Sequence, residues 1–261
     1  MTTPEFNLAQ LDLTDPATVL RELLDNDQRV RAEFVCVLAS ELAQLTEGLV
    51  ACFQHMPPIH QAAVRLRSQR VDLMCAFALG VVDDLIVSTK LLLVGKVPAS
   101  GNVMRQAIEG VAMALLCSTD EDLVIQARPK QRDIRGCYWR MVWDGNRLVQ
   151  GQHALRQLEW NAAALRVNPE GTAALVEVQK FFHPFSHCGP TTIASRAALE
   201  QPGIFHLGGH FEAAKLDGYR AHMTQRINLC SLLPLFMDHL LDTAAPAAGA
   251  PAAEPNPSAS A

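Results

Sequence analysis

The segment 181–189, Phe-Phe-His-Pro-Phe-Ser-His-Cys-Gly, holds the densest cluster of potentially reactive side chains in the chain. Imidazoles and hydroxyls serve enzymes as bases, nucleophiles and metal ligands. Two of the histidines are four residues apart, a spacing that places both rings on one face of a continuous helix, within reach of one metal ion. The candidate catalytic residues of this segment are His183, Ser186 and His187.

Pro184 argues against a helix through the cluster. Proline is tolerated only in the first turn of a helix, and it disfavours helical dihedral angles in the residue before it. We therefore expect the preceding helix to end near Phe182 and the cluster to lie on a turn anchored by its phenylalanines. Adjacent Ser186 and His187 point apart in such a turn and cannot form a nucleophile–base pair by themselves. The alternative is that the histidines are structural and bind the backbone of a loop.

A second pair of histidines, His206 and His210, repeats the four-residue spacing and is followed by Glu212. If the loop folds back, four imidazoles and a carboxylate converge in a set that suits zinc, manganese or iron. The patterns H-E-x-x-H and E-x-x-H are absent, and a chain with nine histidines also produces such spacings by chance. The candidate metal ligands are His183, His187, His206 and His210.

Two adjacent carboxylates, Asp83 and Asp84, interrupt the most apolar segment of the chain, residues 71–95. On a helix they diverge by about 100°, so at most one can face a given partner. Because a buried carboxylate must be paired, hydrogen-bonded or open to a cavity, we expect Arg105, one turn from Glu109, to pair with one aspartate. These four residues form either a buried network that fixes helix register or the lining of a polar pocket.

Between residues 128 and 147, aromatic side chains are interleaved with a run of basic ones. This combination suits contacts to phosphates together with stacking on bases. The alternative is that Trp139 and Trp143, one turn apart, form a core stripe with the arginines on its solvated flank. The candidate nucleic-acid-binding residues are Arg128, Lys130, Arg132, Arg135 and Arg140.

The elements that must position these residues are predicted to be helices. Asp15 before Pro16 is a helix start, and apolar residues then recur at helical spacing in eight segments. The segments are residues 15–24, 30–53, 59–95, 103–117, 121–143, 147–167, 172–182 and 211–242. Prolines and glycines between 184 and 209 predict a long irregular loop with a short strand at 203–207. The sequence predicts an all-α bundle of about seven helices, with this loop before the last one.

A chain of 261 residues that is 49% hydrophobic can bury a sizeable core. We expect a flexible N-terminus at 1–14, one helical domain at 15–242, and a disordered tail rich in alanine and proline at 243–261. The net charge of −5 argues against wholesale binding to nucleic acid or to an anionic membrane, although a local basic face remains open.

The seven scattered cysteines indicate free thiols, and charged residues divide the apolar segment 71–95 into runs too short to cross a bilayer. We therefore expect a cytoplasmic protein with no membrane span. Serine-hydrolase elbows, P-loops and dinucleotide glycine motifs are absent, which disfavours the commonest nucleotide-dependent enzymes.

An arginine and a glutamate one turn apart in residues 101–109, followed later by Phe-His-Pro-Phe-Ser-His, form a combination seen in other proteins. It resembles a group of poorly characterised bacterial all-helical proteins related to the HEPN class, whose helical domains occur in RNA-cleaving toxins and phage-defence systems. The resemblance covers residues 71–189. The HEPN ribonuclease motif is an arginine followed after four to six residues by a histidine. Arg147 and His153 meet that spacing, with Val149 where a polar residue is usual.

The resemblance implies a homodimer in which Arg147 stabilises the scissile phosphate and His153 acts in acid–base catalysis. We expect a helical binding or regulatory protein, associated with bacterial defence or toxin systems, with a protein or RNA partner and no cofactor. One alternative is a metal-independent ribonuclease of HEPN type. The other is a metal-dependent enzyme built from histidines and a carboxylate.

Overall fold

The computed structural model describes residues 12–201 and 203–244. Within them the predicted all-α class is confirmed, with one two-stranded sheet added. Helix α1 (Pro16–Leu24) begins where predicted, because the Asp15 carboxylate accepts hydrogen bonds from the backbone N–H groups of Ala17 and Thr18. The last helix continues to Ala244, two residues into the predicted tail. The rest of that tail, and residues 1–11 of the predicted flexible N-terminus, lie outside the described residues.

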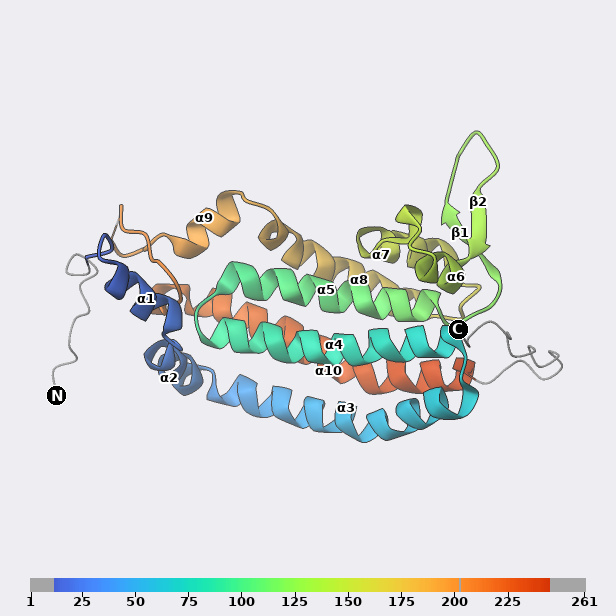
Figure 1. The fold of residues 1–261 in the computed structure, drawn as a ribbon, viewed down its shortest axis with the longest axis horizontal. Helices are drawn as coiled ribbons and strands as arrows, with labels where there is room; N and C mark the ends of the chain where they lie inside the picture. The colour runs from blue at the N-terminus through green and yellow to red at the C-terminus, as the bar shows by residue number, and fades with distance from the viewer. Residues whose placement is uncertain (1–11, 202, 245–261) are drawn as a thin grey trace, which may run out of the picture.

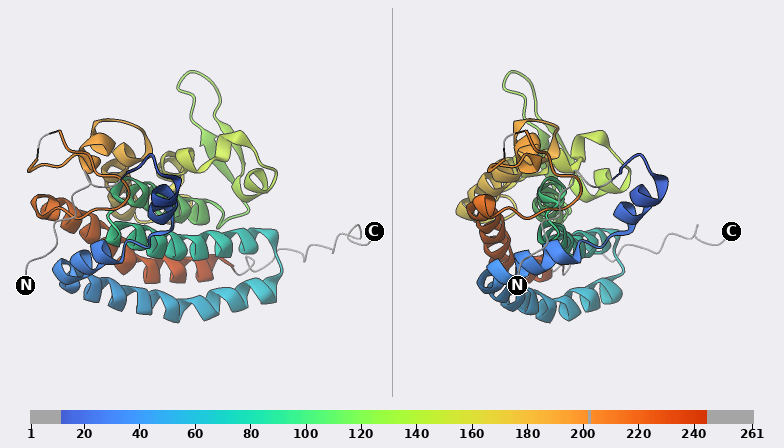
Figure 2. Two further views of the ribbon diagram at one scale, coloured as in Figure 1. Left: turned by 60° about the vertical axis from the view of Figure 1, so that its left-hand side comes forward. Right: turned by 90° about the vertical axis from the view of Figure 1, so that its left-hand side faces the viewer.

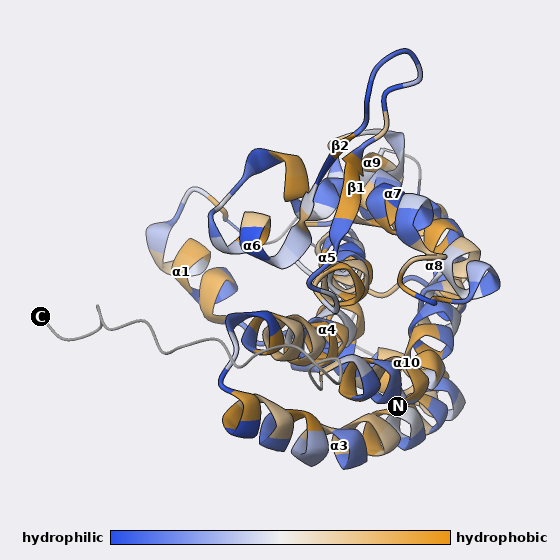
Figure 3. Ribbon diagram, turned by 90° about the vertical axis from the view of Figure 1, so that its right-hand side faces the viewer, coloured by the Kyte–Doolittle hydropathy of each residue, from blue (hydrophilic) through white to orange (hydrophobic). Residues whose placement is uncertain are grey.

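Four long helices form the centre of the molecule. They are α3 (Ala39–Leu66), α4 (Gln69–Leu93), α5 (Val97–Leu116) and α10 (Leu216–Ala244), with α4 packed chiefly on α5 and α10 on α3 (Figure 1). Figure 3 shows the apolar faces of α4 and α5 in the middle of the bundle. A helix that is apolar on nearly every side must be buried.

Shorter helices complete the outer layer. α7 (Gly151–Asn161) and α8 (Pro169–Phe182) cover α5, and α2 (Gln28–Val37) contacts α3 and α4. α9 (Pro190–Arg196) lies beside α5 at the end of the bundle where α1 is also found (Figure 2). Helix α5 therefore has α4 on one side and α7 and α8 on another, and it is the central helix on which most of the outer layer packs.

The predicted helix at 121–143 is wrong. An antiparallel hairpin, β1 (Asp122–Gln126) and β2 (Ile134–Cys137), is followed by the short helix α6 (Tyr138–Trp143). Leu123 and Ile125 are buried while their neighbours are more exposed, which is the period of two that a strand requires. The hairpin loop projects from the body of the molecule and carries Pro129, which a helix interior would exclude (Figure 1).

The break predicted between the segments 30–53 and 59–95 is also wrong, because α3 runs through the prolines that lie there, Pro57 and Pro58. Both prolines are exposed, so the carbonyl groups that lose their helical donors can be hydrated. Buried Cys52 and Ile59 hold the helix to the bundle on either side. The helix α9 forms within the loop predicted at 184–209. An isolated β-bridge joins Ala197 to Phe205, and Phe205 lies in the predicted strand at 203–207.

None of the helices in residues 12–201 and 203–244 is by itself long and apolar enough to span a bilayer. By length and composition alone, the pair Pro16–Val37 and Ala39–Leu66 meets that test together, and it is bent by 89°.

Candidate functional site

The segment 181–189 forms a turn, as Pro184 predicts. α8 ends at Phe182, and His183–Ser186 form a 3₁₀ turn that packs on α5. The rings of His183 and His187 are both exposed and meet edge to face with their centroids 5.1 Å apart. The Ser186 hydroxyl is buried and makes no hydrogen bond. The two imidazoles therefore pair on the surface, apart from the serine.

The phenylalanines of this segment pack around a histidine of α10. The ring of His222 lies 4.8 Å from that of Phe185, between centroids, and 5.2 and 5.4 Å from those of Phe181 and Phe182. His222 is only 3% exposed, and burial, together with the nearby Arg226 charge, lowers its pKa to about 3. The aromatic part of the segment thus joins α8 to the core.

Arg226 is the largest fully buried side chain among the described residues. Its guanidinium donates hydrogen bonds to the Ser100 hydroxyl and to the backbone carbonyls of Ser88 and His222, and it faces the ring of Phe182 at 5.7 Å. No carboxylate in the described part of the chain pairs with it. This polar cluster joins α4, α5 and α10. Nothing in the sequence marks Arg226 as buried.

An open polar pocket of about 290 Å³ lies between α5 and the start of α7. On one side Arg105 and Glu109 form an ion pair, with 2.9 Å between Nη2 and Oε1. The Nε of Arg105 is buried and makes no hydrogen bond, whereas the buried Oε1 of Glu109 has the Nη2 of Arg105 as its partner in the ion pair. We call this site the α5–α7 pocket. It is lined by Asn102, Arg105, Gln106, Glu109, Gln150, Gly151 and Gln152.

Close approaches to α5 flank the α5–α7 pocket. Gly101, Arg105 and Glu109 follow one another at four-residue intervals and share a face of the helix. A Cβ added at Gly101 would lie only 2.6 Å from the Cγ of Phe185. A Cβ on Gly151 would lie 3.0 Å from the Oε2 of Glu109. Glycine at both positions therefore lets the 181–189 turn and α7 approach the helix on either side of Arg105.

The expected pair between Arg105 and one of the two aspartates is wrong. Asp83 is exposed on α4, and no ion pair of Asp84 occurs among the described residues, while burial and the Asp83 charge raise the pKa of Asp84. Ser100 faces α4, since its hydroxyl donates to the Ser88 carbonyl at 2.7 Å. The face of α5 that carries Arg105 points instead to α7, so the guanidinium meets Glu109 of its own helix.

The basic residues of 128–140 lie on the hairpin and on α6, and the helix expected to carry them does not form. Arg128 is partly buried, while Lys130, Arg132, Arg135 and Arg140 are exposed. The Arg140 guanidinium lies 5.2 Å from the ring centre of Trp139. Trp139 is partly buried and donates to Asp120, whereas Trp143 is 54% exposed. The core-stripe alternative therefore suits Trp139 better than Trp143.

Arg147 precedes, and His153 follows, the residues 150–152 that line the α5–α7 pocket. Arg147 is exposed in the 3₁₀ turn Arg147–Val149, and His153 is exposed in the first turn of α7. The Nε2 of His153 lies 3.4 Å from the Nε2 of Gln152, which lines the pocket. Sequence reasoning missed the glutamines here, although a glycine between two exposed amides at a helix start was a visible signal.

The metal site expected from four histidines does not form, because only two of them come together. His206 and His210 stack with ring centroids 4.0 Å apart, and Glu212 joins them, but His183 and His187 do not. The α9 helix separates the two histidine pairs along the chain. Burial lowers the pKa of His210 to about 4 and also lowers that of His206, so both are neutral at pH 7. The Lys215 ammonium lies against this cluster, 2.9 Å from the Oε2 of Glu212.

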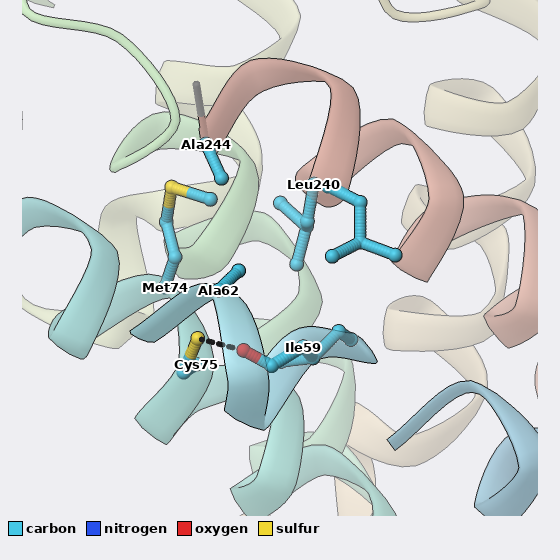
Figure 4. A pocket seen from close by; sticks show the side chains of 7 residues that line it. Ile59, Ala62, Met74, Cys75, Leu240 and Ala244 are labelled. Carbon is cyan, nitrogen blue, oxygen red and sulfur yellow. Dashed lines mark hydrogen bonds between the residues drawn. The ribbon is translucent and has the colours of Figure 1, made fainter. Parts of the chain in front are cut away.

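A small apolar cavity of about 10 Å³ lies between α3, α4 and α10. Ile59, Met74, Cys75 and Leu240 are among the residues that line it, and a hydrogen bond joins the Cys75 thiol to the Ile59 carbonyl (Figure 4). A space of this size without free polar groups suits neither a ligand nor a bound water.

No known protein family, curated protein or solved structure matches this chain.

Proposed function

We propose that the protein is a helical binding module whose α5–α7 pocket holds one base of a single-stranded RNA. The observation that carries the proposal is the Nε of Arg105, a buried donor in the pocket that makes no hydrogen bond while the Nη2 of the same guanidinium is paired with Glu109. Buried polar atoms nearly always have a hydrogen-bond partner, and an unpartnered one costs about 1–3 kcal/mol. A ligand that supplies an acceptor to the Nε of Arg105 removes this cost.

The chemistry of the pocket favours a neutral planar group. The charges of Arg105 and Glu109 cancel, so the pocket does not select an anion. Four carboxamides surround the ion pair, and each can donate and accept in one plane, as a base edge does. They belong to Asn102, Gln106, Gln150 and Gln152.

Basic and aromatic residues lead along the chain to the same pocket. Exposed Arg140 and Trp143 on α6 are followed by exposed Arg147 and then by Gln150 of the pocket wall. Arginines supply phosphate contacts, and an exposed tryptophan supplies a surface on which a second base can stack. RNA binding also fits the resemblance to HEPN-related bacterial defence and toxin proteins, which remains part of the proposal.

Fluorescence anisotropy with labelled single-stranded RNA of each homopolymer sequence tests the proposal. The double variant Gln150→Ala/Gln152→Ala removes two exposed carboxamides from the pocket without touching the core. We expect it to weaken binding about tenfold or more, because a bidentate base contact is worth about 1–3 kcal/mol. The matched control is Gln54→Ala, an exposed glutamine of α3. Equal affinity of the double variant and the wild type would contradict the proposal.

A metal-independent ribonuclease of HEPN type is the second candidate, because His153 borders the pocket wall at Gln152. A histidine there can reach the sugar and phosphate of a bound nucleotide. If this candidate is right, the protein cleaves RNA in the presence of chelator, His153→Ala abolishes the cleavage, and the exposed control His60→Ala retains it. RNA that is bound but left intact by the wild type eliminates it.

A further inference from the structure

Three potential metal ligands gather at the end of the loop between α9 and α10. His206, His210 and Glu212 each offer one ligand atom, and these atoms lie within 4.8 Å of one another. The two imidazole rings are stacked nearly parallel, at 14°. Ligand atoms around a zinc ion lie about 3–4 Å apart, so the cluster needs to contract by only about 1 Å to hold one.

Each of the two histidines has a buried ring nitrogen that makes no hydrogen bond. These atoms are the Nε2 of His206 and the Nδ1 of His210, while the Oε2 of Glu212 is paired with the Lys215 ammonium. His210 and Glu212 are each only 9% exposed. Native proteins rarely leave such atoms unpaired, and here two of them occur on stacked histidine rings within five residues of sequence.

The carboxylate is already held in one orientation. Its Oε1 accepts hydrogen bonds from the backbone N–H groups of Leu199 and Glu200, at 2.6 and 3.1 Å. Outer contacts of this kind commonly fix the carboxylate of a metal site. The other oxygen, Oε2, lies against the Lys215 ammonium, which also contacts the Nε2 of His210.

Lys215 is the competing cation. Its Nζ lies 2.9 Å from the Oε2 of Glu212 and 3.3 Å from the Nε2 of His210. The ammonium also donates to the backbone carbonyls of Ser195 and Ala197. An ion that binds Glu212 must therefore displace the ammonium from the carboxylate, while the two carbonyl contacts can remain. The Lys215 ammonium thus shows that these donors attract a cation, and its competition for Glu212 limits the affinity for a metal ion.

We propose that His206, His210 and Glu212 bind one divalent transition-metal ion of the zinc type. Two imidazoles and one carboxylate suit zinc, cobalt or nickel, whereas calcium and magnesium prefer oxygen donors alone. Three protein ligands leave a fourth position for water. The ion joins the two sides of the Gly208–Gly209 turn and fixes the loop that leads into α10. The site is separate from the α5–α7 pocket and does not depend on the RNA proposal.

The test uses the full-length chain, purified without an affinity tag and stripped with chelator. Cobalt(II) alone is titrated while its visible absorption is followed, zinc(II) competition is then measured, and calorimetry gives the stoichiometry. We expect one ion per chain, with visible bands typical of four- or five-coordinate cobalt. His206→Ala, His210→Ala and Glu212→Gln should each weaken binding at least tenfold. Glu212→Gln keeps the acceptor for Leu199 and Glu200, so it should fold as the wild type does.

The matched control is the double variant His183→Ala/His187→Ala, which removes an exposed histidine pair of the same spacing. It should bind cobalt as the wild type does. Lys215→Gln removes the competing ammonium and should bind more tightly, which a purely structural lysine would not produce. Circular dichroism checks the fold of each variant. If the wild type fails to bind one ion per chain, or if only the control variant loses binding, the proposal is overturned.

Discussion

His222 should make the stability of the protein depend on pH in a way that one substitution removes. The ring is enclosed by Phe181, Phe182 and Phe185, its Nδ1 has no hydrogen-bond partner, and the charge of Arg226 lies nearby. Protonation would bury a second positive charge there. His222 is therefore harder to protonate in the folded protein than in the unfolded chain.

The size of the effect follows from the two pKa values. His222 titrates at about 3 in the folded protein, against an ordinary value of 6.5. Between these values the unfolded state binds more protons, so stability is fully present above pH 6.5 and falls as the pH falls towards 3. A pH of 5 is 1.5 units below the pKa of the unfolded histidine, and each unit changes the free energy of unfolding by about 1.36 kcal/mol. The loss from pH 8 to pH 5 is therefore about 2 kcal/mol.

Urea unfolding followed by circular dichroism at pH 8 and pH 5 measures this loss. His222→Leu cannot be protonated, so its free energy of unfolding should change by about 2 kcal/mol less than that of the wild type between the two pH values. Other buried histidines contribute equally to both proteins and cancel in the difference. His60→Leu, at an exposed position of α3, should keep the full dependence. Identical pH dependence of the wild type and His222→Leu would refute the reasoning.

Three further outcomes are expected. Gly101→Ala should lower the free energy of unfolding by about 1–3 kcal/mol, because its Cβ would collide with Phe185, whereas Gly171→Ala, with open space in α8, should raise it by about 0.5–1 kcal/mol in the same urea assay. Arg226→Met should retain or raise stability by removing a buried charge that lacks a carboxylate, while Arg226→Ala should lower it by about 2–4 kcal/mol by leaving a cavity. Trp143→Ala should weaken RNA binding by about 1–3 kcal/mol in anisotropy with little change in thermal unfolding, since the ring is exposed.

Helical periodicity predicted most of the bundle, and its failures have local causes. The strand Asp122–Gln126 has the run Leu-Val-Ile, whose short apolar pattern fits a helix or a strand equally well. Pro129 and the alternating burial of Leu123 and Ile125 favour the strand once the hairpin forms. Pro57 and Pro58 failed to end α3 because both face solvent, where their cost is smaller.

Only part of the candidate site could be predicted from the sequence. Arg105 and Glu109 could be recognised as a pair because they lie one turn apart on one helix. Gln150 and Gln152 join them through packing between α5 and α7, which no local pattern encodes. Arg226 shows the same limit, because the serine that accepts its hydrogen bond is on a different helix.

The Nε–H signal of Arg105 in a ¹H–¹⁵N spectrum tests the RNA-binding proposal most directly. This group has no hydrogen-bond partner in the free protein, and the proposed base supplies one. The signal is assigned by its loss in Arg105→Lys. Adding single-stranded RNA should shift it downfield in proportion to the fraction bound, while the Nε–H of Arg70, a buried arginine with its own partners, should not move. An Arg105 signal that stays in place at saturating RNA would contradict the proposal.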